Sequence, residues 1–177
     1  MKDWVKPLLR RLRPEKVSPE AFDAELSQPP LVWRRLAGLF LHDFRSDGMV
    51  ELLGSVLADL PPWEFDLLFR TRPFFILAKS PGFVQSLHAT GSLVLIIFHE
   101  SELQPMTWTE RRGVIIHELV HVLKSHATRP FSLDDPHRSA LEAQCDDTAR
   151  ELGFSEEIDA VRRYVKKKER RLNHGRI

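Results

Sequence analysis

Apolar residues recur at helical spacing through the first part of the chain. In residues 31–44, and again in residues 49–60, they fall three and four positions apart, which is the pattern of an amphipathic helix. The proline pairs at 29–30 and 61–62 are expected to end the segments that precede them. We therefore expect a helical N-terminal region, residues 1–72, that packs on or covers the rest of the chain.

Short apolar runs replace this pattern from residue 73 onward. Residues 73–78 form one run and residues 93–98 the strongest, dense in β-branched residues, while residues 84–89 between them are expected to form a second short strand. Runs of this length between proline, glycine and serine residues predict strands. The sequence thus predicts a small sheet at the start of a core that comprises residues 73–177.

Helical signals return after the sheet. Residues 107–110 have the capping-box form Thr-x-x-Glu before an apolar run, which predicts a helix over residues 108–125. Asp135-Pro136 and Gly153 are expected to begin and end the next helix, and Ser155 to begin the last one. The predicted fold class is α+β, mainly helical, with the small sheet directly before the first of these helices.

Composition agrees with a globular protein. The chain has 177 residues, of which 42% are hydrophobic and 29% charged, and its formal net charge is +1. The single cysteine, Cys145, allows no internal disulfide, which agrees with a reducing compartment. No apolar run approaches the roughly 20 residues of a membrane helix. We expect a soluble, cytoplasmic protein without a membrane-bound part.

Candidate chemistry lies in the helix of residues 108–125, which contains His117-Glu118-Leu119-Val120-His121. Residues four apart share a helix face, so the two histidines can bind one zinc ion, Zn²⁺. Glu118 follows His117 by about 100° around the helix and can reach a water beside the metal as general base. The alternative is a pair of partly buried histidines satisfied by their neighbours, but burying these polar groups in an apolar helix is costly.

A catalytic zinc site needs a third protein ligand. The pattern HExxHxxGxxH is excluded, since Lys124 and Ala127 occupy the positions that would need glycine and histidine. His126 is expected to point away from the ligand face.

The following helix supplies a better ligand. We assign Glu142 as the third ligand and Asp146, four residues later on the same face, as the carboxylate that accepts the outer N–H of a ligand histidine. Cys145 is the rival ligand on this helix, although a lone buried cysteine is more often a small hydrophobic residue.

These residues resemble the gluzincin metallopeptidases, which combine HExxH with a glutamate from a second helix, often within Glu-x-x-x-Asp. The resemblance covers residues 73–153 and is closest to the minimal core of that family. It implies a zincin-like core, with metal ligands His117, His121 and Glu142 and with Glu118 as catalytic base. It also implies that the strand of residues 93–98 is an edge strand that aligns the substrate backbone.

In this family a side chain often stabilises the oxyanion, and the sequence ranks no candidate for it above the others. The candidates are Tyr164, His88, His99, His137 and Arg138.

The expected function is that of a zinc endopeptidase acting on a peptide or protein. Zinc would polarise the scissile carbonyl, and Glu118 would pass a proton from water to the leaving amine. One alternative is a non-catalytic zinc-binding domain that regulates or binds peptides. A minor alternative is a DNA-associated protease, because residues 1–13 and 166–171 are basic. The plain interpretation of these basic segments is a surface arm and a solvated helix end.

Overall fold

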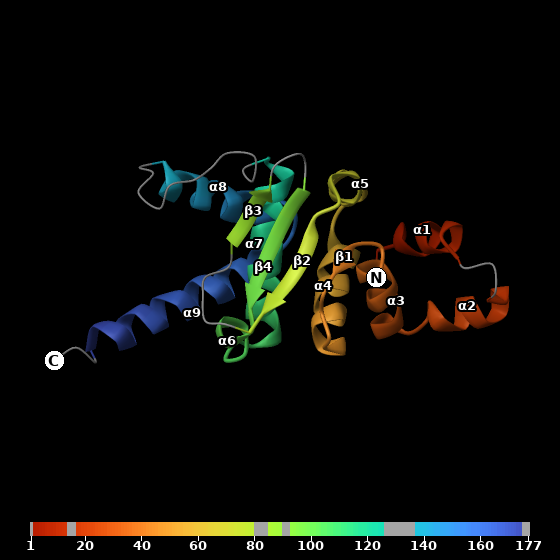
Figure 1. Ribbon diagram of the computed structural model, residues 1–177, viewed down its shortest axis with the longest axis horizontal. Coiled ribbons are helices and arrows are strands. Elements are labelled where there is room, and N and C mark those ends of the chain that lie inside the picture. Colours follow the sequence, from red (N-terminus) through yellow and green to blue (C-terminus); the bar gives the residue numbers. More distant parts are fainter. Residues whose placement is uncertain (1, 14–16, 80–84, 90–92, 126–136, 175–177) are drawn as a thin grey trace.

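The computed structural model describes residues 2–13, 17–79, 85–89, 93–125 and 137–174 of the chain. The described part is mainly helical and carries one small sheet (Figure 1), so the predicted α+β class is confirmed. In chain order its elements are α1 (Val5–Arg11), α2 (Pro19–Glu25), α3 (Pro29–Ala37), β1 (Leu41–His42), α4 (Asp47–Asp59), α5 (Pro62–Thr71), β2 (Phe74–Ala78), β3 (Gln85–Ala89), β4 (Leu93–His99), α6 (Glu100–Leu103), α7 (Trp108–Leu123), α8 (Arg138–Glu151) and α9 (Ser155–His174).

The sheet has four strands in the order β1-β2-β4-β3. β2 runs parallel to β1 and to β4, whereas β3 runs antiparallel to β4. The strand of residues 93–98 is therefore an inner strand, and its prediction as an edge strand is wrong. β4 pairs with β2 on one side, Phe74 opposite Leu95, and with β3 on the other, Leu87 opposite Leu95. The edge strand next to it is β3.

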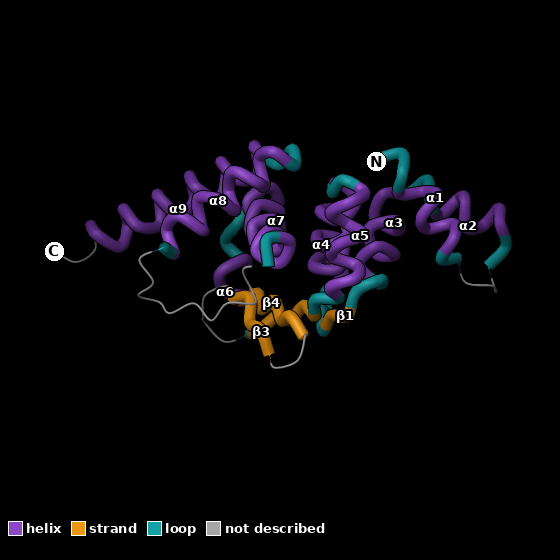
Figure 2. The backbone as a smooth tube through the Cα atoms, turned by 90° about the horizontal axis from the view of Figure 1, so that it is seen from above, coloured by secondary structure: helices purple, strands orange, loops and turns teal. Residues whose placement is uncertain are grey.

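Helices α4, α5 and α7 lie on the same side of this sheet (Figure 2). Along β4 the buried residues Val94, Ile96 and Phe98 alternate with half-buried neighbours, because successive side chains of a strand point to opposite faces. Phe98 stacks against Phe75 of β2 with a centroid separation of 6.5 Å. The core thus lies between the sheet and the helices, with α7 at its centre.

Both proline pairs follow the end of a helix, as predicted, since α2 ends at Glu25 and α4 at Asp59, but each pair also begins the next helix. Pro29 and Pro62 open α3 and α5, because the first helical turn has no need of the N–H that proline lacks. The helix expected over residues 31–44 ends at Ala37, and β1 follows. The N–H of Asp43 donates to Phe75 O, and its side chain accepts from Leu77 N. These hydrogen bonds to β2 replace those that a longer helix would have made in this segment.

Strand β1 brings the N-terminal part of the chain into the same sheet as β2 and β4. Arg112 of α7, with only 11% of its side chain exposed, strengthens this connection. It donates to Ser55 and Asp59 of α4 and to Glu157 of α9. The division of the chain at residue 72 stays a prediction, and the two parts share both a sheet and this ion-pair network.

Helix α7 begins where the sequence predicts. Thr107 Oγ1 accepts from Glu110 N at 3.3 Å, and Glu110 Oε2 accepts from Thr107 N at 2.6 Å, so the predicted capping box is confirmed. At Gly113 the helix packs tightly on α9, since a Cβ there would lie 2.4 Å from Glu157 O. This close approach sets the position of α9 against the HExxH helix.

Helix α8 is described from Arg138, with His137 at its N-cap, and the predicted start at Asp135-Pro136 lies outside the described residues. Its predicted end is confirmed, because Gly153 adopts a φ of 98° that favours glycine. Within the described residues, no helix has both the length and the apolar character needed to cross a membrane.

Candidate metal centre

Three side chains from two helices converge at one point. His117 and His121 lie one turn apart on α7, and Glu142 faces them from α8, which packs against α7. Glu142 Oε2 lies 2.8 Å from His117 Nε2 and 3.8 Å from His121 Nε2. The two Nε2 atoms are 3.2 Å apart. These three residues form a group that can hold a metal ion.

The separation of the two nitrogens fits a tetrahedral ion. Zinc binds imidazole nitrogen at about 2.0–2.1 Å, so two ligands at tetrahedral positions are roughly 3.3 Å apart. The observed 3.2 Å between the Nε2 atoms matches that edge. Two imidazoles and one carboxylate also form a donor set typical of a divalent transition metal with a position left for water. The residues present therefore fit such an ion.

Asp146 holds the outer nitrogen of His117. Its Oδ1 lies 2.9 Å from His117 Nδ1, so the N–H at Nδ1 donates to the carboxylate. This contact fixes the ring orientation and directs the Nε2 lone pair toward the ligand group. Arg162 of α9 donates from Nε to the other oxygen, Oδ2, of the same carboxylate. Asp146 is buried, and its negative charge is compensated from both sides.

Cys145 occupies the corresponding position beside His121. Its Sγ lies 3.3 Å from His121 Nδ1, the nitrogen that faces away from Glu142. Burial, together with the charges of Glu142, Glu118 and Asp146, raises the pKa of the thiol to about 12. Cys145 is therefore a neutral thiol on the outer side of His121. It is neither in the ligand group nor merely a hydrophobic filler.

The charged groups of the site shift one another's pKa values. Burial lowers the pKa of His117, but the hydrogen bonds to Asp146 and Glu142 outweigh it and raise the pKa to about 9. The hydrogen bonds from His117 and His121 hold the pKa of Glu142 well below its usual range. Burial raises the pKa of Asp146, but the hydrogen bonds from His117 and Arg162 lower it. The net effect is a pKa below the usual value of an aspartate. Without metal, the site thus holds a proton on His117 between two carboxylates.

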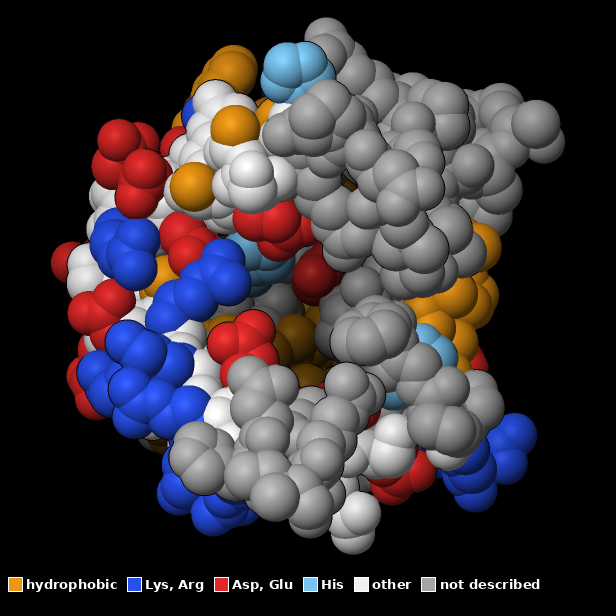
Figure 3. Space-filling view, turned by 90° about the vertical axis from the view of Figure 1, so that its left-hand side faces the viewer, with side chains coloured by type: hydrophobic (Ala, Val, Ile, Leu, Met, Phe, Trp, Pro, Cys, Tyr) orange, Lys and Arg blue, Asp and Glu red, His pale blue; other side chains and the backbone are white. Residues whose placement is uncertain are grey.

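Glu118 lies in the same turn as the histidines and is 9% exposed. Its negative charge contributes to the raised pKa values of both His117 and Cys145. Figure 3 shows a hollow in the face formed at the C-terminal end of the molecule, with histidine and acidic side chains inside it and Lys and Arg side chains beside it.

The other residues named from the sequence are more dispersed. His99 is the N-cap of α6, His137 the N-cap of α8, and Tyr164 is half-buried on α9. His126 lies outside the described residues, as do the side chains of His88 and Arg138. The contacts place none of the described candidates for the oxyanion in the ligand group.

Arg162 is the site residue that sequence reasoning missed. It follows the buried Ile158 by four positions, and its guanidinium reaches Asp146 although 44% of its side chain is exposed. A cation one helical turn after an apolar core position, on the helix that follows the one with the candidate aspartate, is the signal that points to it.

Comparisons with protein-family models, with curated proteins and with solved structures find no match.

Proposed function

We propose that this protein is a zinc-dependent metallopeptidase of the gluzincin type. The proposal rests on one observation. His117 Nε2, His121 Nε2 and Glu142 Oε2 come from two packed helices and lie close enough to one another to bind the same ion. The outer nitrogens of both histidines have partners, Asp146 and Cys145. Such outer contacts orient the rings so that their other nitrogens face the ion, which would displace the proton of His117 on binding.

The donor set supports a catalytic rather than a structural ion. Structural zinc sites have four protein ligands, most often with several thiolates, whereas catalytic sites have three and admit water. Here the nearest thiol, Cys145, is neutral and faces His121 Nδ1. When bound, zinc would supply a Lewis acid for a carbonyl and a lowered pKa for water.

Glu118 is the residue we assign to proton transfer. Its carboxylate takes a proton from the attacking water while the hydroxyl adds to the carbonyl carbon of the substrate. The same carboxyl then gives that proton to the amide nitrogen as the C–N bond breaks. The assignment rests on the burial of Glu118 in the turn that also carries His117, because a carboxylate with little solvent around it transfers protons to bound groups rather than to bulk water.

The substrate backbone is proposed to pair with β3. This strand is at the end of the sheet and is antiparallel to β4, so its outer edge is the place where an extended peptide can add as a further strand. This replaces the assignment of that role to residues 93–98, whose two edges are both taken by β2 and β3.

The test compares Glu118→Gln with wild type and with Glu151→Gln, an exposed glutamate at the end of α8. All three are loaded with zinc and incubated with a broad peptide library. We use the full chain, because β1 belongs to the sheet. Glu118→Gln should keep its zinc and lose at least about a hundredfold in hydrolysis, as expected for loss of a general base, while Glu151→Gln cleaves like wild type.

Two results would overturn the proposal. Cleavage by Glu118→Gln at the wild-type rate would remove Glu118 from the mechanism. A wild-type protein that binds zinc and cleaves no peptide would make the chain a non-catalytic zinc-binding domain.

A further inference from the structure

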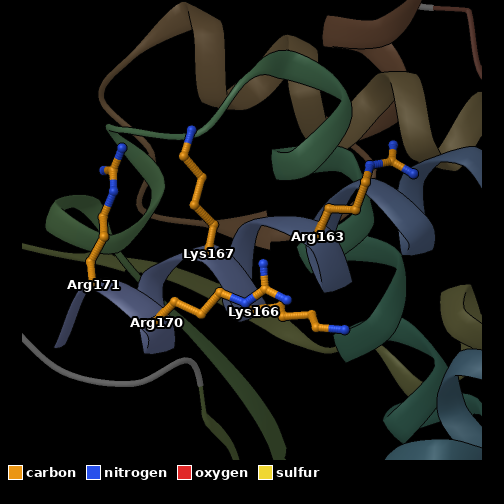
Figure 4. Close-up of a pocket in the computed structure, with 5 residues that line it drawn as sticks. All are labelled: Arg163, Lys166, Lys167, Arg170 and Arg171. Atoms are coloured by element: carbon orange, nitrogen blue, oxygen red, sulfur yellow. The ribbon is translucent and has the colours of Figure 1, made fainter. Parts of the chain in front are cut away.

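Helix α9 carries five cations on one face. Lys166, Lys167, Arg170 and Arg171 lie three, four, seven and eight residues after Arg163, so the five form one stripe along the helix. All five are exposed, and together they line an open hollow of about 490 Å³ (Figure 4). We call this set the α9 stripe.

Two further cations of α9, beside the stripe, contact acids of the protein. Arg162 donates to Asp146, and Lys168 donates to Glu102. The one acid in this part of the helix, Glu169, borders the stripe, three residues after Lys166 and about 60° from it around the helix. The whole chain has a formal net charge of only +1, so the α9 stripe is a local concentration of positive charge rather than a sign of a basic protein.

The stripe also lacks the features that other anionic partners require. It contains no aromatic residue, and unpaired nucleotides bind chiefly by stacking their bases on aromatic side chains. A membrane-bound helix inserts an apolar face, but Ile158 is buried and Val161 packs on Gly113 of α7. The apolar side of α9 is therefore already used within the protein.

We infer that the α9 stripe binds the phosphate backbone of duplex nucleic acid. From Arg163 to Arg171 the helix rises roughly 12 Å at 1.5 Å per residue, which corresponds to about three to four base pairs at 3.4 Å each. Backbone contact of this kind is independent of base sequence. Each phosphate that the stripe neutralises should add about 0.9 to the slope of log affinity against log salt. This inference does not depend on the proposed peptidase activity.

The experiment measures binding of the full chain to a fluorescent 20-base-pair DNA duplex by anisotropy, from 25 to 200 mM salt. The variant Lys166→Glu/Lys167→Glu reverses two charges of the stripe. The matched control Lys6→Glu/Arg11→Glu reverses two exposed charges of α1. Each substitution changes the charge by −2, so both variants go from +1 to +1 − 4 = −3. Circular dichroism and thermal melting verify that both are folded.

We expect the stripe variant to bind at least about tenfold more weakly at 50 mM salt, with a salt slope smaller by about 2. The α1 variant should change affinity less than threefold. Equal losses in the two variants would mean a non-specific charge effect, and no binding to DNA by wild type at 25 mM salt would overturn the inference. A second result would also overturn it: the wild type binds vesicles containing phosphatidylserine more tightly than the duplex, and the stripe variant loses this binding. A milder variant, Lys166→Gln/Lys167→Gln, should give an intermediate loss if the reversed charges impair folding.

Discussion

Arg162 of α9 donates a hydrogen bond from Nε to Oδ2 of Asp146, the aspartate whose other oxygen holds His117. The last of the described helices therefore contributes to the candidate metal centre without lying in the ligand group. Burying Asp146 without a cation would be costly, and Arg162 offsets that cost while keeping the carboxylate ionised. A carboxylate in this state is the acceptor that orients a ligand histidine.

Removing the guanidinium should weaken metal binding. In Arg162→Gln, Asp146 loses its charged partner and its position, so His117 is held less firmly. We expect the zinc affinity to fall by about 10- to 100-fold, the range found when outer partners of metal ligands are changed. The measurement is competition with a chromogenic chelator.

The control for this variant is Arg163→Gln, which removes the same charge from the next residue, on the exposed side of α9. It should bind zinc like wild type. Equal affinities in Arg162→Gln and Arg163→Gln would show that the contact with Asp146 does not support the site.

The close packing of α7 on α9 at Gly113 should make stability sensitive to substitution there. In Gly113→Ala the new Cβ would lie 2.4 Å from Glu157 O and 2.5 Å from Val161 Cγ2. Forcing these helices apart should cost about 1–3 kcal/mol in the free energy of unfolding, as overpacking does, and this outweighs the better helix propensity of alanine. Urea unfolding measures the change.

Gly48→Ala is the matched substitution in α4, where the nearest atom to the new Cβ would be Ser46 Oγ at 3.6 Å. It should leave the free energy of unfolding unchanged or raise it by up to about 1 kcal/mol. A Gly113→Ala protein as stable as Gly48→Ala would mean that α7 and α9 are not packed this closely.

Stability should depend on pH more strongly without metal than with it. In the metal-free protein the pKa of His117 is raised from 6.5 to about 9. A raised pKa stabilises the folded state fully below pH 6.5, and this contribution is lost as the pH rises through 9. The free energy of unfolding of the metal-free protein should therefore fall between these values. Zinc binding displaces the proton, so zinc affinity should rise over the same interval.

Thermal melting of chelator-treated and zinc-loaded protein at pH 6.5, 7.5 and 9 measures this effect. The difference between the two melting temperatures should grow with pH. His42 does not interfere, because burial lowers its pKa and its contribution is confined to pH values below 6.5. A difference that is constant from pH 6.5 to 9 would mean that His117 is not protonated in the metal-free site.

The sequence predicts those parts of the fold that depend on neighbouring residues. Helix α7 has a capping box and a periodic apolar face, and its start at Trp108 is found from these alone. The strands β2 and β4 follow from apolar runs of suitable length. Glu142 and Asp146 are recognisable because their four-residue spacing places them on one face of α8.

Contacts between distant segments could not be found in this way. β1 has only two residues, Leu41 and His42, and it is a strand because β2 lies beside it. The order β2-β4-β3 makes the strongest apolar run an inner strand, which no local pattern reveals. Arg162 reaches Asp146 only after α9 packs on α7 around Gly113. In each case tertiary structure decides what local propensity leaves undetermined.

The central claim is that His117, His121 and Glu142 hold one zinc ion, and the zinc content of the purified protein tests it most directly. Mass spectrometry should find about one zinc per chain in wild type and in Glu151→Ala, an exposed glutamate of α8. Glu142→Ala should retain far less after dialysis against a weak chelator. One zinc per chain in Glu142→Ala, at the affinity of Glu151→Ala, would contradict the claim and require a different third ligand.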